Sequence, residues 1–276
     1  MILQNKIAVI YGAGGSLGGA VAKALAAAGA MIFLTGRNIS SVDEVADEIR
    51  SAGGKAETDQ VDALDEKTIN SHLKKVVEQT GSIDISFNLT ATDVIQNIPL
   101  VDMSMQDYIS PVALMLQTRF LTAKAAGKIM MKQGSGVILS LTATPGGIGY
   151  PYTGGFAAAC VAIENLSSNL AAELGIYGVR VINLRSGGSP DSKVFKSAIE
   201  SDPEGMGRVL GKMEADTMLK KLPLMADIAN VAVFLSSGLA GKITGVTVDI
   251  TSGTTAGLNY RVAATPAHRD PNSLAS

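Results

Sequence analysis

The sequence predicts an α/β fold: a three-layer, doubly wound parallel sheet of about seven strands in a single domain. Short β-rich runs alternate with alanine-rich helical stretches, and this alternation implies parallel strands joined by right-handed crossovers. Six of the strand runs are continuously or nearly continuously apolar, as expected for strands covered on both faces. The 276 residues suffice for one large domain with a sizeable core, and no linker interrupts them.

The element boundaries follow from the apolar runs and the helical periodicity. The expected strands cover residues 6–11, 30–35, 56–61, 84–89, 136–141, 179–184 and 246–250. The expected helices cover residues 17–28, 42–51, 66–79, 108–132, 155–174 and 226–235. Glycines follow several helical runs, where a left-handed C-cap is expected, at Gly29, Gly53, Gly81, Gly134 and Gly175.

Two segments stand outside this alternation within a single domain of residues 1–256. Residues 187–224 are rich in Gly, Ser and Met, and we expect them to form an insertion over the substrate site. Residues 257–276 contain two prolines and a polar run, and we expect a C-terminal extension that is extended or disordered.

Composition narrows the classes of function. A net charge of -2 with 17% charged residues argues against nucleic acid and membrane surfaces as partners, and favours a small apolar molecule. Cys160 is the only cysteine, so an internal disulfide is excluded, and only His72 and His268 are histidines, so no metal site is expected. No run reaches the ~18 apolar residues of a membrane helix, and no signal peptide is recognisable. These features predict a soluble, cytoplasmic protein.

A glycine-rich turn follows the first predicted strand and leads into a helix. Such a turn lets the backbone approach a pyrophosphate, with free amides and the positive end of the helix dipole facing the anion. Close packing of a helix on a strand is the alternative reading of the same glycines. The expected cofactor contacts in this turn are Gly12, Gly14, Gly15, Ser16, Leu17 and Gly18.

The second predicted strand is followed by Arg37, about twenty residues beyond the glycines. An acidic residue at this place would bind an adenosine ribose and repel a 2′-phosphate, whereas an arginine does the reverse. Arg37 therefore favours NADP(H) over NAD(H) as the cofactor. A solvated surface arginine is the alternative.

Residues 136–192 combine a strand, a glycine-containing loop, a helix and a second strand ending in Ser186 and Gly187. This stretch resembles the catalytic half of the short-chain dehydrogenase/reductase family, classical type, and the likeness extends over residues 5–253. The resemblance implies a Rossmann fold, NADP(H), a small carbonyl or alcohol substrate, and a homodimer or homotetramer. It also assigns cofactor contacts to Asp62, Ala63, Asn88, Thr90, Ser186 and Gly187, although Asn88 could instead tie strands together.

The positions that resemble the family's catalytic Asn, Ser, Tyr and Lys are occupied by Met115, Ala143, Phe156 and Cys160. In the family these four groups relay a proton to or from the substrate oxygen, and none of the replacements does so. No residue is therefore assigned as catalytic. The candidates to stand in are Thr142, Tyr150, Tyr152 and Arg185; the tyrosines could merely shape the pocket, and Arg185 could bind an acidic substrate or pair with Asp191.

Three functions stay open on this evidence. The first is a divergent NADP-dependent oxidoreductase acting on a small apolar carbonyl or alcohol. The second is a non-redox enzyme, such as an isomerase, cyclase or dehydratase, on the same scaffold. The third is a catalytically silent binding or assembly partner. Small residues along the helix at 155–174 further predict an interface between copies, at Ala158, Val161, Ala162, Asn165, Ser168, Asn169 and Ala172.

Overall fold

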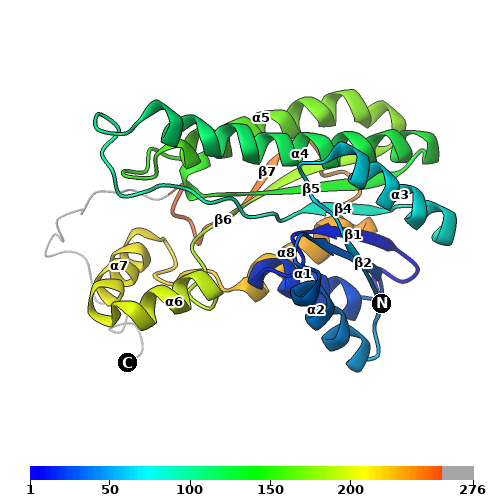
Figure 1. Cartoon of the computed structure of the whole chain (residues 1–276), viewed down its shortest axis with the longest axis horizontal. Helices are drawn as coiled ribbons and strands as arrows, with labels where there is room; N and C mark the ends of the chain where they lie inside the picture. The colour runs from blue at the N-terminus through cyan, green and yellow to red at the C-terminus, as the bar shows by residue number, and fades with distance from the viewer. Residues whose placement is uncertain (257–276) are drawn as a thin grey trace, which may run out of the picture.

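The computed structural model describes residues 1–256 and has one seven-stranded sheet with helices on both faces (Figure 1). All neighbouring strands are parallel, in the order β3-β2-β1-β4-β5-β6-β7, which confirms the predicted fold class. The strands are β1 (Ile7–Tyr11), β2 (Met31–Gly36), β3 (Lys55–Gln60), β4 (Ile85–Asn88), β5 (Gly136–Ala143), β6 (Val179–Ser186) and β7 (Thr247–Ile250).

Two hydrophobic clusters, one on each face of the sheet, form most of the core. One cluster packs the sheet against α1 (Ser16–Ala27), α2 (Ile39–Ser51) and α8 (Met225–Ser236). The other packs it against α3 (Glu66–Thr80), α4 (Met105–Gln133) and α5 (Gly155–Leu174). The short 3-10 turns are η1 (Thr144–Gly146), η2 (Gly175–Tyr177) and η3 (Gly238–Ala240).

Two details of the predicted elements were wrong. The third strand is not an apolar run: β3 reads KAETDQ and is mostly half-buried or exposed, because it lies at the edge of the sheet and pairs only with β2. Gly175 is not a left-handed cap, because α5 continues into η2; the left-handed residue is Gly178, with φ +74°. Its amide then closes the turn on the Gly175 carbonyl.

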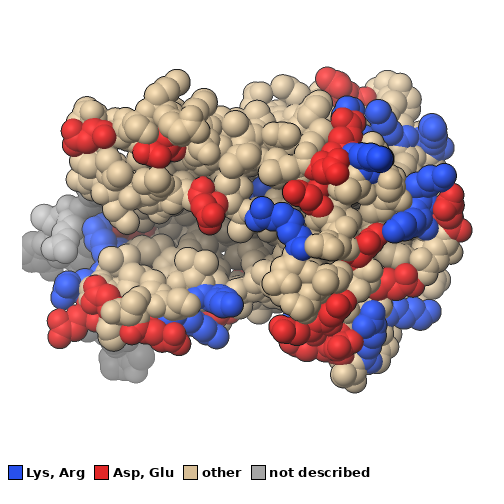
Figure 2. Space-filling model, in the orientation of Figure 1, with Lys and Arg blue, Asp and Glu red and all other residues tan. Residues whose placement is uncertain are grey.

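The segment 187–224 contains two helices that we did not predict, α6 (Lys193–Ser201) and α7 (Pro203–Asp216). They lie beyond the carboxyl ends of the strands, on the side of α1 and α8 (Figure 1). The backbone N–H of Lys193 donates to Ser16 Oγ at 3.0 Å, so α6 begins against the glycine-rich turn. The surface is hollowed between α4 and α5 on one side and α6 and α7 on the other (Figure 2).

The predicted C-terminal extension, 257–276, lies outside the described residues. Among residues 1–256, none of the helices has the length and apolar character to span a bilayer.

Candidate cofactor and active site

A pocket of about 820 Å³ opens where β1, β2, β3 and β4 end. This edge is where an α/β sheet binds its ligands, because loops diverge there on either side of the strand at which the order reverses. The wall comes from the glycine turn, the ends of β2, β3 and β4, and one face of α4. Its lining residues are Gly12, Gly14, Gly15, Gly36, Arg37, Asn38, Ser41, Val42, Val61, Asp62, Ala63, Leu64, Leu89, Thr90, Ala91, Thr92, Asp93, Ser110, Leu114 and Thr118.

The glycines of the turn serve two different purposes. Gly12 has φ +76°, and a Cβ on it would lie 2.8 Å from the backbone of Leu89 and Thr90, so the turn approaches the end of β4 closely. A Cβ on Gly18 would lie 2.2 Å from the Gly12 carbonyl oxygen, so Gly18 lets α1 pack against the turn. Gly15 lies on the pocket wall, and a Cβ on it would make only a van der Waals contact, 3.4 Å from the Gly12 carbonyl oxygen. A side-chain-free cradle of this kind fits a pyrophosphate group.

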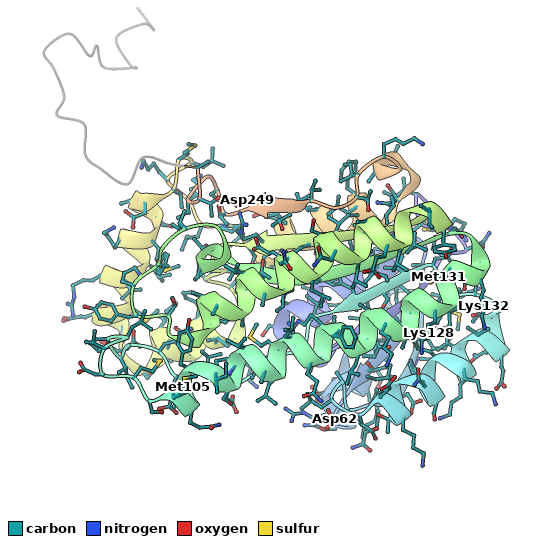
Figure 3. The ribbon with its side chains drawn as sticks, turned by 90° about the horizontal axis from the view of Figure 1, so that it is seen from above. Asp62, Met105, Lys128, Met131, Lys132 and Asp249 are labelled. Carbon is teal, nitrogen blue, oxygen red and sulfur yellow. The ribbon has the colours of Figure 1, made fainter. Side chains whose placement is uncertain are left out.

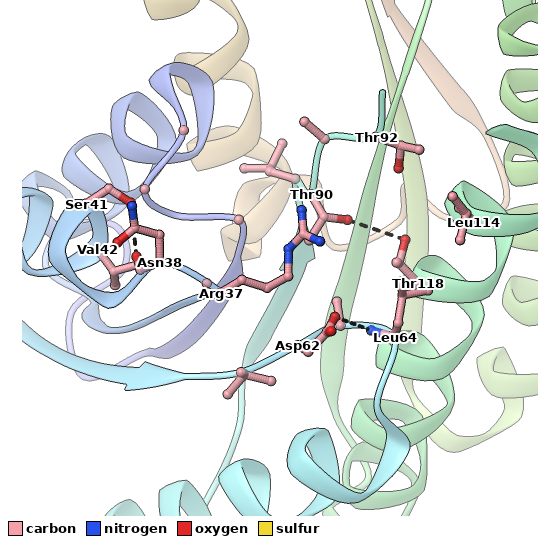
Figure 4. A pocket seen from close by; sticks show the side chains of 18 of the residues that line it. Arg37, Asn38, Ser41, Val42, Asp62, Leu64, Thr90, Thr92, Leu114 and Thr118 are labelled. Atoms are coloured by element: carbon pink, nitrogen blue, oxygen red, sulfur yellow. Dashed lines mark hydrogen bonds between the residues drawn. The ribbon is translucent and has the colours of Figure 1, made fainter. Parts of the chain in front are cut away.

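Arg37 lies on the pocket wall directly after β2, and its side chain extends into the pocket (Figure 4). The residue is exposed, and no carboxylate of residues 1–256 forms an ion pair with it. Asn38 Oδ1 accepts from the backbone N–H of Ser40 at 3.2 Å and caps α2, and Ser41 follows on the wall. An unpaired guanidinium thus lies beside the N-terminus of α2, and both attract anions.

Some of the other predicted cofactor residues line the pocket, and the rest lie outside its lining. Asp62, Ala63 and Thr90 line the pocket. Asn88 does not: its amide donates to the Thr118 carbonyl and to Thr122 Oγ1, both at 3.0 Å, so it ties β4 to α4 rather than strand to strand. Five further residues lie outside the lining set, namely Ser16, Leu17, Gly18, Ser186 and Gly187.

The residues at the positions predicted to correspond to the catalytic relay have apolar surroundings. Met115 on α4 packs with Ala159 and Ile163 on α5, and Phe156 lies against this cluster. Ala143 is the last residue of β5. Met115 and Phe156, the residues predicted at the Asn and Tyr positions, therefore belong to or border a small hydrophobic cluster.

Cys160, predicted to stand at the lysine position, is fully buried. Burial raises the pKa of its thiol to about 11, and the nearby Glu164 adds to this, whereas a backbone N–H at Ala143 and the charge of Arg119 oppose it. The thiol is neutral at physiological pH, so it is not an activated nucleophile.

The candidate stand-ins for the proton donor are placed as follows. Thr142 is buried; its hydroxyl donates to Glu164 Oε1 at 2.8 Å and accepts from Asn183 Nδ2 at 2.7 Å, so its proton is committed. Tyr152 is 56% exposed with φ +62°, and its neighbour Tyr150 is half-buried.

Arg185 pairs with two carboxylates, neither of which is Asp191. Its Nη2 lies 2.5 Å from Glu164 Oε2, and its Nη1 lies 3.2 Å from Asp249 Oδ2. The bond to Glu164 raises the pKa of Arg185. Burial alone would raise the pKa of Asp249, but hydrogen bonds from Thr251, Thr255 and Arg185 lower it overall. Asp191 instead accepts from the Met225 backbone, 3.1 Å away.

The most unusual charged residue is one that sequence reasoning missed. Arg119 on α4 is 5% exposed, and its guanidinium donates to Thr90 O at 2.9 Å and to Thr90 Oγ1 and Thr118 Oγ1 at 3.0 Å. Burial lowers its pKa to about 10, which leaves it charged at neutral pH. The sequence contained one signal for this site. Thr118 and Thr122 are four residues apart, which places them on one face of the predicted helix, and Arg119 lies between them.

Other site residues were missed because their role depends on distant partners. Asn38 and Ser41 reach the pocket only through the position of α2, and Glu164 and Asp249 gain their role from Arg185. In the described range 1–256, no group of three or more His, Cys, Asp or Glu side chains is placed to hold a metal ion.

Known proteins share this architecture and sequence pattern. The family model described as enoyl-(acyl carrier protein) reductase matches residues 12–255. An uncharacterized oxidoreductase of Thermotoga maritima is 30% identical over 256 residues, which cover 93% of this chain and 100% of that protein. A 7alpha-hydroxysteroid dehydrogenase of Escherichia coli is 28% identical over 257 residues, covering 93% and 97%. The crystal structure of levodione reductase superposes with a TM-score of 0.84 at 26% identity, covering 92% of this chain and 99% of that one.

The chain therefore belongs to the short-chain dehydrogenase/reductase family, as its sequence pattern predicted. This family consists of oxidoreductases that bind NAD(P)(H) and act on small molecules.

Proposed function

We propose that the protein binds NADP(H) and acts as a divergent oxidoreductase on a small apolar carbonyl or alcohol. The observation that carries this proposal is the glycine cradle at Gly12, which opens into the 820 Å³ pocket at the carboxyl end of β1. Gly12 must be glycine both for its φ of +76° and for its contact with Leu89. Close packing of α1 explains why residue 18 is a glycine, but it does not account for the open cradle at Gly12.

The proposed preference for NADP(H) over NAD(H) is supported by Arg37. A 2′-phosphate beside this guanidinium and the N-terminus of α2 would gain two favourable interactions. NADH lacks that phosphate. No acidic residue stands in the lining of the pocket at the end of β2, where it would repel the phosphate.

The cofactor supplies hydride chemistry when bound, and the chain's own residues bind and orient it. The hydroxyl of Thr142 is committed to Glu164, and the thiol of Cys160 holds its proton at physiological pH. Met115 and Phe156 exclude water from the same region. We therefore propose that the substrate or solvent provides the proton, with the tyrosines at 150 and 152 as the remaining candidates on the chain.

An apolar substrate is supported by the segments that border the hollow. The loop between β4 and α4 exposes Ile95, Leu100 and Val101, and the segment after α7 exposes Met218 and Leu219. Exposed apolar side chains on these two segments favour an apolar ligand.

We also propose a homodimer or homotetramer built on α4 and α5. These helices pack side by side, and their outer surfaces are open in the single chain (Figure 3). Val161 is 53% exposed on α5 and Phe120 is 46% exposed on α4, so apolar side chains face outward there.

Cofactor titration followed by a turnover assay tests the function. Calorimetric titration should give tighter binding of NADPH than of NADH. NADPH consumption should be weak with simple ketones, because losing one positioned acid or base costs about 10²- to 10⁴-fold. Product formed without cofactor turnover would favour a non-redox enzyme, and binding without any turnover would favour a silent family member. Absence of binding would overturn the proposal.

Gly12→Ala is the matching variant, since its Cβ would meet the backbone of Leu89 at 2.8 Å. It should abolish NADPH binding. Gly81→Ala is the control: Gly81 has a similar φ of +83°, but nothing lies within 4 Å of its Cβ position and it is remote from the pocket. The control should lose stability by about 1 kcal/mol and keep its affinity.

A further inference from the structure

Arg119 is a buried cation without a counter-charge. Its three hydrogen bonds go to neutral oxygens of Thr90 and Thr118, and its Nε has no partner. No carboxylate of residues 1–256 forms an ion pair with it. Burying an unpaired charge is costly, and charges of this kind are normally paired or serve a ligand.

The guanidinium lies directly behind the pocket wall. The guanidinium binds Thr90 and Thr118, and both of these residues line the pocket (Figure 4). Thr90 follows closely on the end of β4 at Asn88. On its other side Arg119 borders a small buried space together with Asn88, Leu139 and Ser140, so it faces β4 and β5. It therefore lies on the side of β1 opposite to Arg37, which follows β2.

This placement puts Arg119 at the nicotinamide half of the proposed cofactor. With the 2′-phosphate at Arg37 and the pyrophosphate at Gly12, the adenosine would lie on the side of β2 and β3. The remaining half would then extend across β1 toward β4 and β5. Arg119 is the buried charge on that side.

The groups around Arg119 leave its charge uncompensated. The Cys160 thiol is neutral, and Glu164 is bound to Arg185 and Thr142. Asp93 is the carboxylate on this part of the pocket wall, and it is exposed, so water screens it. A buried charge acts through a lower effective dielectric constant than an exposed one, and the field of Arg119 therefore dominates.

We propose that Arg119 makes the site discriminate between the two redox forms of the cofactor, binding the reduced form more tightly. The reduced nicotinamide ring is neutral, whereas the oxidised ring carries a positive charge that the buried guanidinium repels. This inference rests on the proposed cofactor binding. Arg119 acts on the nicotinamide ring through the electric field of its charge, and it is not a catalytic residue. Tighter binding of NADPH shifts the redox equilibrium of the bound cofactor toward the reduced form, so the protein holds NADPH as its resting ligand.

The test compares dissociation constants of NADPH and NADP⁺ by calorimetric titration, with no turnover needed. Wild type should bind NADPH at least about tenfold more tightly, which corresponds to a modest interaction between two charges at an effective dielectric constant near 20. Arg119→Met keeps an unbranched apolar stem and removes the charge, so it should bring the two constants to within about threefold. Arg119→Lys keeps the charge and should keep the preference.

Arg37→Ala is the matched control, because both redox forms carry the same 2′-phosphate. It should weaken NADPH and NADP⁺ by the same factor and leave their ratio unchanged. Asp93→Asn should change the ratio by less than about threefold, since that carboxylate is screened.

Equal affinity of wild type for the two forms, or tighter binding of NADP⁺, overturns the inference. This measurement uses the wild-type protein alone, so it tests the inference even if Arg119→Met fails to fold. An unchanged ratio in folded Arg119→Met also overturns it. Failure of wild type to bind either form would instead overturn the proposed function.

Discussion

At the scale of single residues, Arg37 and His72 each make a measurable prediction. Both carry or can acquire a positive charge, but their surroundings differ. Arg37 is exposed on the pocket wall, where it can bind an anion. His72, on α3, is buried beside Phe33.

Arg37→Ala should lower the affinity for NADPH by about 10- to 100-fold, because a hydrogen bond to a charged group contributes about 1.5–3 kcal/mol. NADH affinity should stay the same, since NADH has no 2′-phosphate. Calorimetric titration of both cofactors measures the effect. Arg208→Ala is the control for net charge, because Arg208 is exposed on α7 and absent from the pocket lining. Equal wild-type affinity for both cofactors would contradict the preference.

His72 predicts how stability depends on pH. Burial lowers the pKa of His72, and the Asp59 carboxylate, 3.0 Å from Nδ1, opposes this only in part. The folded protein therefore keeps His72 neutral at a pH where the unfolded chain, with a pKa near 6.5, binds a proton. The unfolded state is favoured by that proton, so the free energy of unfolding should fall as pH drops below about 6.5.

Urea unfolding at a series of pH values measures this effect. His72→Gln should flatten the curve between about pH 5 and 6.5, where ordinary carboxylates titrate little. Asp59→Asn should steepen it, because the variant removes the group that raises the pKa of His72. A wild-type curve that is flat over this range would show that burial does not depress the histidine.

At the scale of elements, the ion cluster of Glu164, Arg185 and Asp249 joins α5, β6 and β7. The register aligns Arg185 with Thr142 on β5 and with Asp249 on β7, so the three strands and α5 meet at one charged group. The side chains of Glu164 and Arg185 are only 14% and 16% exposed. Removing one partner leaves the other charge poorly solvated.

Glu164→Gln should destabilise the protein by about 2 kcal/mol, which is less than the roughly 3–5 kcal/mol for a broken buried pair, because Asp249 still holds Arg185. Chemical unfolding measures the change. Glu173→Gln on the exposed side of α5 is the control and should alter stability by less than about 0.5 kcal/mol. Combining Glu164→Gln with Arg185→Met should cost less than the sum of the two single changes. An additive result would mean that the pair is not coupled.

At the scale of the whole molecule, the open faces of α4 and α5 predict assembly. Small side chains at Ala158 and Ala162, with Val161 exposed between them, would let a helix of another copy approach closely. Light scattering of wild type should give at least twice 28.4 kDa. Ala162→Arg should lower that mass, because the long charged side chain blocks the approach. A monomeric wild type would refute the interface.

The sequence by itself determined the fold class, the family, and the positions of the strands and helices other than α6 and α7. These depend on local patterns: apolar runs, helical periodicity, and the glycines that follow β1. It also identified Gly12, Gly14, Gly15, Arg37, Asp62, Ala63 and Thr90, which line the pocket. A residue at the end of a parallel strand faces the ligand edge whatever the rest of the chain does.

Only the tertiary structure decided which charged groups meet. Arg185 pairs with Glu164 and Asp249, 21 and 64 residues away, because strand register and helix packing bring them together. Arg119 is separated from Thr90 by 29 residues, and sequence could not reveal that it is buried without a counter-charge. The position of β3 at the edge of the sheet was likewise decided by the order of the strands, although its polar residues, KAETDQ, can be read in the sequence. Long-range contacts of this kind are set by packing, and local pattern carries no record of them.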